Sequence, residues 1–220
     1  MVMHVLIPPG GRAEFLITIP PQNQFAQLIA QKYDTGPAGE STPYRVIANL
    51  DASDRGPLAS STMPGVPVGI AAPPPATLAG LKPAHLRKLY FSESANPAIY
   101  YITLEGHMPK AFDMRFKRPN VTVKQGTVED WVIENRANEA HTFHIHQLHF
   151  QVIERDGKPA TDSSLRDTID LPFWDGKTAY PSVKLRMDFR SPEIVGTFLY
   201  HCHILEHEDA GMMGVIRVVK

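Results

Sequence analysis

Two short clusters of histidine constrain the fold and chemistry of this chain more than any other feature. The stretch HTFHIHQLHF, residues 141–150, carries four histidines, and HCHILEH, residues 201–207, carries three more. The second cluster also contains Cys202, the only cysteine of the chain. Because seven of the ten histidines fall in these two segments, the sequence indicates a common site rather than scattered surface positions.

Short apolar runs with turn signals between them predict the fold class. In residues 85–220 the runs include LRKLYFS, AIYYITL, TVEDWVIEN, HTFHIHQLHFQVIE, SVKLRMDF, GTFLYHCHI and GVIRVV, and the segments ERDGKP and FWDGK have turn composition. No long segment has a helical period. Several short strands at this spacing predict an all-β sandwich or barrel.

Composition divides the chain into three segments. Residues 1–54 contain the strand-like runs VLIPPGGRAEFLITIP and PYRVIANLDA. Residues 55–84 contain seven prolines and no charge between Arg55 and Lys82, which predicts an extended linker. Residues 85–220 carry both histidine clusters. The first segment is too short for a complete β-sandwich, which takes roughly 100 residues.

The strand interpretation separates the clustered histidines into two layers. Side chains alternate between the two faces of a strand, so His141 points away from His144 and His146. By the same rule Cys202 points away from the histidines on either side of it. If the two strands pair, His141 and Cys202 share one layer. The other layer then holds half of a second metal site, formed by His144, His146, His201 and His203.

Two residues that follow the cysteine can complete its layer. His207 comes five positions after Cys202 and can return to the same side through a short turn, and Met212 comes five positions later. Two imidazoles, a thiolate and a distant thioether are the ligand set of a blue-copper electron-transfer site. The sequence therefore predicts a copper site formed by His141, Cys202, His207 and Met212.

A zinc site is the main alternative at the level of ligand types, because Zn²⁺ also binds cysteine and histidine. The triplet from His201 to His203 argues against it, since adjacent residues of a strand face apart and cannot all bind one metal ion. We interpret the remaining histidines as surface, hydrogen-bonded or supporting residues rather than ligands: His4, His85, His107 and His149.

Charge and hydropathy exclude several classes of partner. The net charge is −1 and no basic run is present, so nothing indicates binding to nucleic acid or to an anionic membrane surface. No apolar run approaches the length that spans a membrane. The first residues lack the charged region and cleavage site of a signal peptide. A single cysteine excludes an internal disulfide framework.

At these motifs the chain resembles the multicopper oxidases, a family that includes laccases, bilirubin oxidases, spore-coat laccases and copper-efflux oxidases. The family motif H-x-x-H-x-H is matched from His141 to His146, and H-C-H-x-x-x-H-x-x-x-x-M is matched from His201 to Met212. AFDMRF, TVEDWVIEN and RDTIDLP are also similar to its last domain. Residues 85–220 thus resemble the C-terminal cupredoxin domain, a Greek-key β-sandwich. Residues 1–54 resemble the end of the middle cupredoxin domain.

The resemblance implies a role for each motif residue. His141, Cys202 and His207 would bind a type 1 copper, with Met212 as the axial ligand. His144 would bind a type 2 copper. The type 3 pair would be bound by His146, His201 and His203.

The resemblance also implies a route for electrons and protons. Electrons from a small phenolic or aromatic donor would enter at the type 1 copper and pass through Cys202 to reduce dioxygen. Glu208 matches an acid that helps to deliver protons in bacterial members of the family. Asp167 is interpreted as a structural or supporting residue. Because most members are exported, the resemblance implies a periplasmic or secreted location.

The chain departs from the family in the number of its cluster histidines. The trinuclear cluster needs eight, and the chain supplies four, because the two H-x-H motifs of an N-terminal domain are missing. Type 2 and type 3 coppers would therefore need ligands from elsewhere, such as a missing N-terminal polypeptide. Copies of the same chain could associate but lack the same motifs.

Three hypotheses of function remain open. The first is a laccase-type oxidoreductase, which we favour because the H-C-H triplet is intact. The second is a mononuclear blue-copper protein that carries electrons or binds copper. The third is an inactive fragment of a larger oxidase. A dedicated cuprous oxidase is less favoured. Copper-efflux oxidases carry a Met-rich insert after a stretch that resembles AIYYITLEGHMP, and here only Met108 and Met114 occur nearby.

Overall fold

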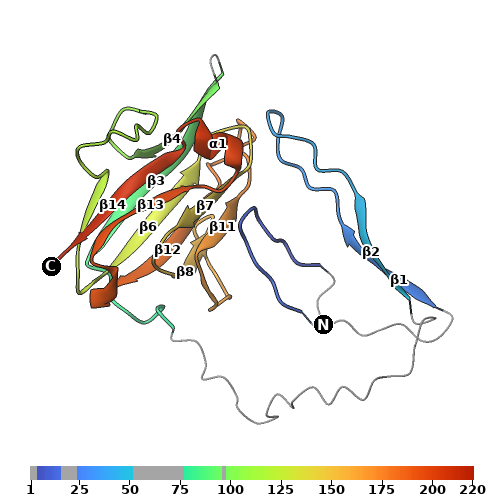
Figure 1. Ribbon diagram of the computed structural model, residues 1–220, viewed down its shortest axis with the longest axis horizontal. Coiled ribbons are helices and arrows are strands. Elements are labelled where there is room, and N and C mark those ends of the chain that lie inside the picture. Colours follow the sequence, from blue (N-terminus) through green and yellow to red (C-terminus); the bar gives the residue numbers. More distant parts are fainter. Residues whose placement is uncertain (1–3, 16–23, 52–76, 96–97) are drawn as a thin grey trace, which may run out of the picture. The chain divides into compact units, whose positions relative to one another are not determined.

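The computed structural model of the protein describes residues 4–15, 24–51, 77–95 and 98–220 (Figure 1). The chain divides into two compact units. One unit consists of the described residues within Met1–Arg12, Thr35–Gly39 and Pro75–Lys220. The other consists of those within Ala13–Asp34 and Glu40–Pro74.

The smaller unit contains one antiparallel strand pair, β1 (Phe25–Ala30) and β2 (Arg45–Asp51). The prediction of a strand in the run VLIPPGGRAEFLITIP is wrong over residues 5–15, which form loops and turns, while residues 16–20 lie outside the described part. The physical reason is local: prolines lack the N–H group that a sheet needs, and Gly10 has a positive φ of 73°.

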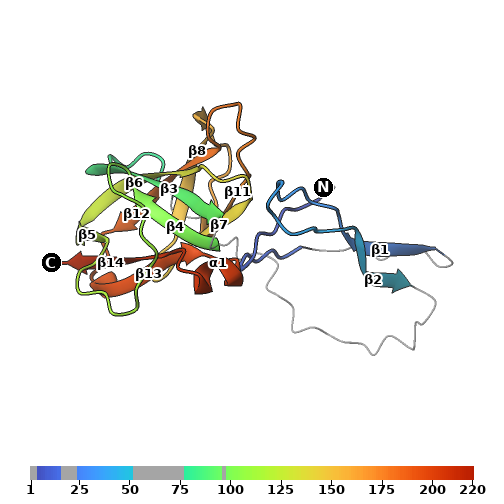
Figure 2. The ribbon, with the colours of Figure 1, turned by 90° about the horizontal axis from the view of Figure 1, so that it is seen from above.

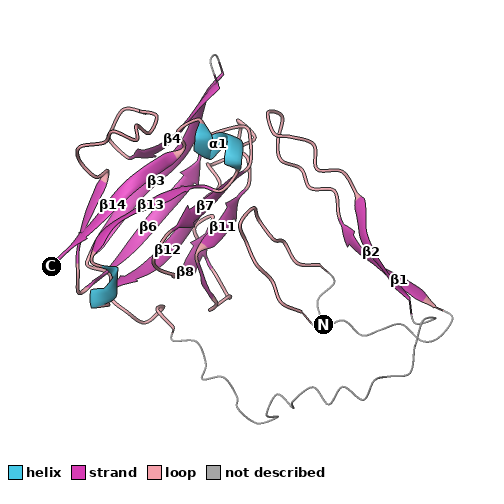
Figure 3. Ribbon diagram, viewed as in Figure 1, coloured by secondary structure: helices cyan, strands magenta, loops and turns pink. Residues whose placement is uncertain are grey.

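The larger unit contains two sheets within its described residues (Figures 2 and 3). The first sheet consists of β10 (Leu165–Arg166), β8 (Phe150–Arg155), β12 (Ser182–Phe189), β6 (Thr127–Asn135), β3 (His85–Ala95) and β4 (Ala98–Leu104), with β9 (Lys158–Pro159) paired to β8. The second consists of β11 (Thr168–Leu171), β7 (His141–Ile145), β13 (Gly196–Cys202), β14 (Met213–Val219) and β5 (Val121–Lys124). This arrangement confirms the predicted all-β fold.

One hydrophobic core lies between the two sheets. It takes Trp131 and Leu185 from the first sheet and Phe143 and Ile216 from the second, each with an exposed fraction of at most 1%. Burial of each such side chain contributes roughly 1.5–3 kcal/mol. The described residues also form two short helices, η1 (Pro192–Ile194) and α1 (Leu205–Asp209). None of the described helices is long and apolar enough to cross a membrane.

The run HTFHIHQLHFQVIE does not form one strand. It is divided between β7 of the second sheet and β8 of the first. Gln147 lies between them with a positive φ of 67°, a conformation that ends a strand and turns the chain. The chain therefore crosses from one sheet to the other directly after the last histidine of the first motif.

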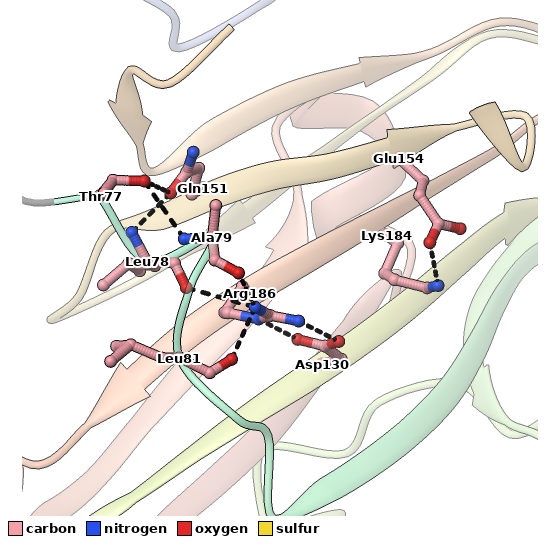
Figure 4. A network of polar contacts seen from close by, with 9 residues as sticks. All are labelled: Thr77, Leu78, Ala79, Leu81, Asp130, Gln151, Glu154, Lys184 and Arg186. Atoms are coloured by element: carbon pink, nitrogen blue, oxygen red, sulfur yellow. Dashed lines mark hydrogen bonds and ion pairs between the residues drawn. The ribbon is translucent and has the colours of Figure 1, made fainter. Parts of the chain in front are cut away.

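A buried polar network holds residues 77–81 against the first sheet (Figure 4). Arg186 on β12 forms an ion pair with Asp130 on β6, and its guanidinium also donates to the carbonyl oxygens of Leu78, Ala79 and Leu81. The side chain of Gln151 on β8 accepts a hydrogen bond from the amide of Leu78 at 2.6 Å. Most of the predicted linker lies outside the described residues, and these few residues at its end pack on the sandwich.

Candidate metal centre

The pairing of β7 with β13 brings the two histidine clusters together. His144 lies opposite His201, and Phe143 lies opposite Cys202. Because side chains alternate along each strand, Cys202 shares a face with His141, and His144 shares the other face with His201. The two layers expected from strand parity are therefore set by the register of one antiparallel pair.

Three potential ligands gather on the face that contains the cysteine. Nδ1 of His141 lies 3.1 Å from Nδ1 of His207, and the sulfur of Cys202 lies 3.9 Å and 3.8 Å from these two nitrogens. The exposed fractions are 1% for His141, 2% for His207 and 0% for Cys202. The three ligand atoms thus converge on one buried point.

The geometry of this triangle fits a metal ion. The point equidistant from the three atoms is about 2.1 Å from each, close to the bonds of about 2.0–2.3 Å that nitrogen and sulfur form with zinc. A planar set of two imidazoles and one thiolate is the equatorial ligand set of blue-copper sites. The donor atoms therefore suit copper, and their spacing leaves room for one ion.

Electrostatics at this site also favour a cation. Burial and the neighbouring His207 lower the pKa of His141 well below its usual value, so its imidazole is a neutral ligand at neutral pH. Burial also acts to lower the pKa of His207, but its contacts with Cys202 and Glu139 outweigh burial and raise that pKa to about 9. A position that stabilises positive charge in this way suits a metal ion.

Met212 is placed next to the three converging ligands by the backbone. The N–H of Cys202 donates to the carbonyl oxygen of Met212 at 3.0 Å, and the N–H of Met212 donates to the carbonyl oxygen of His207 at 2.9 Å. The Met212 side chain is fully buried. The role of its sulfur as an axial ligand stays a prediction.

The second group of histidines lies on the opposite face of the strand pair. One ligand atom from each of His144, His146 and His201 lies within 4.8 Å of the others, and Nε2 of His146 is 3.1 Å from Nε2 of His201. The ring of His203 lies 5.1 Å from that of His144, centre to centre. All four histidines predicted for this layer therefore form one cluster.

The ring of His144 is held and kept neutral by its surroundings. Its Nδ1 donates to the carbonyl oxygen of Asp167 at 3.0 Å and lies 3.0 Å from the hydroxyl oxygen of Thr168. Burial and the nearby His201 lower the pKa of His144 to about 4. Asp167, interpreted from the sequence as structural or supporting, thus fixes this imidazole and leaves Nε2 free to bind a metal ion.

The turn of residues 8–12 approaches His203 of this second group. Arg12 forms an ion pair with the carboxylate of Asp167 at 2.9 Å. At Gly10 an added Cβ would lie 2.3 Å from a ring carbon of His203. The turn can approach the ring this closely only because Gly10 has no side chain and tolerates a φ of 73°.

Gly10→Ala is therefore expected to displace the ring of His203. The positive φ alone costs about 1–2 kcal/mol for an alanine, and the clash adds to it. The matched control is Gly157→Ala, since Gly157 has a φ of 71° and open space around its Cα. Both variants should lose some stability on thermal unfolding, but only Gly10→Ala should shift the NMR signals of the His203 ring. Equal shifts in both variants would contradict the close approach.

Glu208 lies at the junction of the two groups. Its carboxylate is 3.2 Å from Nδ1 of His201, which also lies 2.9 Å from the carbonyl oxygen of Cys202. The carboxylate is partly exposed. Glu208 can therefore orient His201 and can connect it to solvent.

The other histidines lie outside both groups. The side chains of four histidines are exposed: His4, His85, His107 and His149. For His4, His85 and His107 this agrees with the surface positions that the sequence indicates. Two residues next to His207 are missing from the sequence predictions. They are Glu139, beside Nε2 of the ring, and Tyr100, whose ring stacks on the imidazole at 4.1 Å. The position of Glu139, two residues before the first motif, is the one local signal for it.

Comparison with known proteins shows that this chain is similar to multicopper oxidases. The family model for multicopper oxidases matches residues 91–220. The chain is 40% identical over 125 residues to a multicopper oxidase of Staphylococcus aureus, covering 54% of this chain and 25% of that protein. It is 26% identical over 235 residues to a laccase of Haloferax volcanii, covering 96% of this chain and 38% of that protein.

Solved structures of similar proteins agree in fold. A laccase of Pediococcus acidilactici has 30% identity and a TM-score of 0.50, covering 64% of this chain and 28% of that chain. A multicopper oxidase of Campylobacter jejuni has 24% identity and a TM-score of 0.59, covering 91% and 42%, and shows likeness of fold alone. The chain spans 25% and 38% of the length of the two curated relatives. Because the family model matches more than half of its residues, the chain belongs to the multicopper oxidase family.

Proposed function

We propose that this chain forms a type 1 copper site and accepts single electrons there from phenolic or similar aromatic donors. Copper is the metal of the family, and the proposed ligands are His141, Cys202, His207 and, as axial ligand, Met212. The observation that carries the proposal is the buried triangle of two imidazole nitrogens and one sulfur. Bound copper would supply one-electron redox chemistry at this point.

The residues of the chain also define a path away from this site. Cys202 is covalently joined to His201 and His203, whose rings lie in the second group. We propose that the four histidines of that group contribute half of a trinuclear copper cluster, with His144 at the type 2 copper and the others at the type 3 pair. Glu208 is proposed to move protons towards dioxygen, since its carboxylate contacts His201 and is partly exposed.

The complete activity depends on ligands that the chain does not contain. Four of the eight histidines of the trinuclear cluster are present, so dioxygen reduction would need ligands from outside these 220 residues. Within the proposal, residues 85–220 are the C-terminal cupredoxin domain, residues 55–84 a linker, and residues 1–54 part of a middle domain. The exported location usual in the family is proposed for this protein too.

A second candidate function is that of a mononuclear blue-copper electron carrier. The group on the cysteine face favours it, because all three converging atoms come from this chain and a type 1 site can work without a second metal centre. The retention of His201 and His203 beside Cys202 favours the oxidase, since a carrier has no use for these two ligands.

Copper content and spectra of the isolated protein test the proposal. We expect the copper-loaded chain to show an intense thiolate-to-copper band in the visible spectrum. The reason is that the sulfur of Cys202 and one ring nitrogen each of His141 and His207 lie within 4.8 Å of one another, so all three could bind one copper ion. One copper per chain without a type 2 signal in electron paramagnetic resonance would support the carrier. Close to four coppers would mean that another molecule supplies the missing ligands. Bound copper without the visible band would contradict the type 1 site.

A further inference from the structure

The imidazole of His207 is held at both of its nitrogens. Nδ1 faces Cys202 and His141, while Nε2 lies 3.4 Å from Oε1 of Glu139. Glu139 has an exposed fraction of 7%, so this contact is shielded from solvent. An imidazole that donates its Nε2–H to a carboxylate keeps the lone pair of Nδ1 directed at the metal position.

The backbone of Glu139 is fixed by a buried amide. Asn135, at the end of β6, donates from Nδ2 to the carbonyl oxygen of Glu139 at 2.7 Å and to that of Pro172 at 2.8 Å. Its Oδ1 accepts a hydrogen bond from the N–H of Ala137 at 3.0 Å. The loop from β6 to β7 therefore has a defined shape. The loop leads directly into His141, the first residue of β7. A proposed copper ligand therefore follows directly after the loop that carries the carboxylate in contact with His207.

The face of the same imidazole is covered from another strand. The ring of Tyr100 on β4 stacks on His207 with the ring centres 4.1 Å apart and the planes 17° apart. Helix α1, which carries His207, lies next to β4 and β13 (Figure 1). Rotation of the ring would break the stack with Tyr100 and the contact with Glu139 together.

The burial of Glu139 needs a compensating positive charge. A carboxylate removed from water costs several kcal/mol unless it is paired. The carboxylate of Glu139 forms an ion pair with the ring of His207. A copper ion on Nδ1 of the same ring would add positive charge to that ring, so a buried acid at this point suits a metal-bound histidine.

We propose that Glu139 is the positioning residue for the copper ligand His207. Glu139 accepts the Nε2–H of the ring, selects the tautomer that could bind a metal ion through Nδ1, and limits rotation of the ring. Asn135 in turn fixes the backbone of Glu139. The inference rests on the proposed type 1 site. It concerns the strength and the spectrum of copper binding, and not the overall fold.

The test compares copper binding by the full chain and by three variants, measured by competition with a chelator. Glu139→Leu removes the acceptor and is expected to weaken copper binding about 10–100-fold, the usual effect of losing such a partner. Glu139→Gln keeps an acceptor oxygen and should recover most of the affinity. The matched control, Glu206→Gln, removes an exposed carboxylate one residue from His207 and should leave the affinity unchanged.

Two further readouts separate positioning from a general loss of structure. The thiolate-to-copper band should shift in Glu139→Leu and stay in place in Glu206→Gln. In protein loaded with diamagnetic Zn²⁺, the Nε2–H of His207 should give a slowly exchanging NMR signal that is lost in Glu139→Leu. If Glu139→Leu does not fold, a faster exchange of that signal in Glu139→Gln supports the proposal, and unchanged exchange overturns it.

The outcomes distinguish this inference from the function on which it rests. A wild-type chain with the visible band, together with unchanged affinity and band in Glu139→Leu, overturns the role of Glu139 and leaves the copper site intact. A wild-type chain that binds copper without the band overturns the type 1 site. In that case, a protected Nε2–H that depends on Glu139 would still support the contact between the two side chains.

Discussion

Cys202→Ser is expected to abolish the visible band of the copper-loaded protein and its reaction with phenolic donors. Cys202 is the only cysteine of the chain, so no other side chain can supply the thiolate. A serine hydroxyl does not ionise at neutral pH and is a harder ligand, so copper would bind weakly and without the thiolate transition. The measurements are the visible spectrum, electron paramagnetic resonance and the rate at which a phenolic donor is oxidised.

Folding of this variant can be checked separately. Cys202 is fully buried, and a hydroxyl without a partner at such a position costs about 1–3 kcal/mol, which a sandwich with a large core can tolerate. Circular dichroism should therefore show native strand content. The control is His4→Ala, because His4 is exposed and lies outside both ligand groups, and it should leave colour and rate unchanged. A Cys202→Ser protein that kept its full colour would show that the type 1 assignment is wrong.

Strand parity explains why so much of the candidate site could be predicted from the sequence. The alternation of side chains depends only on neighbouring residues, so the separation of Cys202 from His201 and His203 follows as soon as the segment is recognised as a strand. The return of His207 to the cysteine face needs just one turn, and α1 provides it. Local geometry therefore determines most of both groups of candidate ligands.

Contacts between distant segments could not be predicted in this way. Glu139 and Tyr100 meet His207 from the β6–β7 loop and from β4, and no periodicity in the sequence relates these positions. The approach of Gly10 to His203 joins residues far apart in the chain. Such contacts depend on how the sheets pack, which single-strand patterns do not encode.

The strand prediction from the sequence differs from the structure at two segments, the run HTFHIHQLHFQVIE and the segment RDTIDLP. Gln147 is not a usual turn residue, and its positive φ divides what the apolar pattern indicates is a single strand. The segment RDTIDLP forms the short edge strand β11 (Thr168–Leu171), which was not predicted as a strand because it has few apolar residues. Its pairing with β7 nevertheless places Thr168 beside His144.

Arg186→Met is expected to lower the free energy of unfolding by about 3–5 kcal/mol, the usual effect of removing one partner of a buried ion pair. Asp130 has an exposed fraction of 6% and would keep its charge without the guanidinium that binds both of its oxygens at 2.7 Å and 2.9 Å. Three carbonyl oxygens of residues 78–81 would lose the same donor. For a chain of this size the melting temperature should fall by roughly 6–20 °C.

A double variant separates the two parts of this loss. Arg186→Met with Asp130→Leu removes the unpaired charge, and replacing both partners of a buried pair by apolar residues is often close to neutral. We expect it to recover most of the stability in urea unfolding, while cleavage by a protease within residues 77–84 stays faster than in the wild type. The control, Arg190→Met, removes an exposed ion pair with Asp188 and should change little, because exposed pairs contribute little. A double variant as unstable as Arg186→Met would mean that the carbonyl contacts, rather than the charge of Asp130, account for the loss.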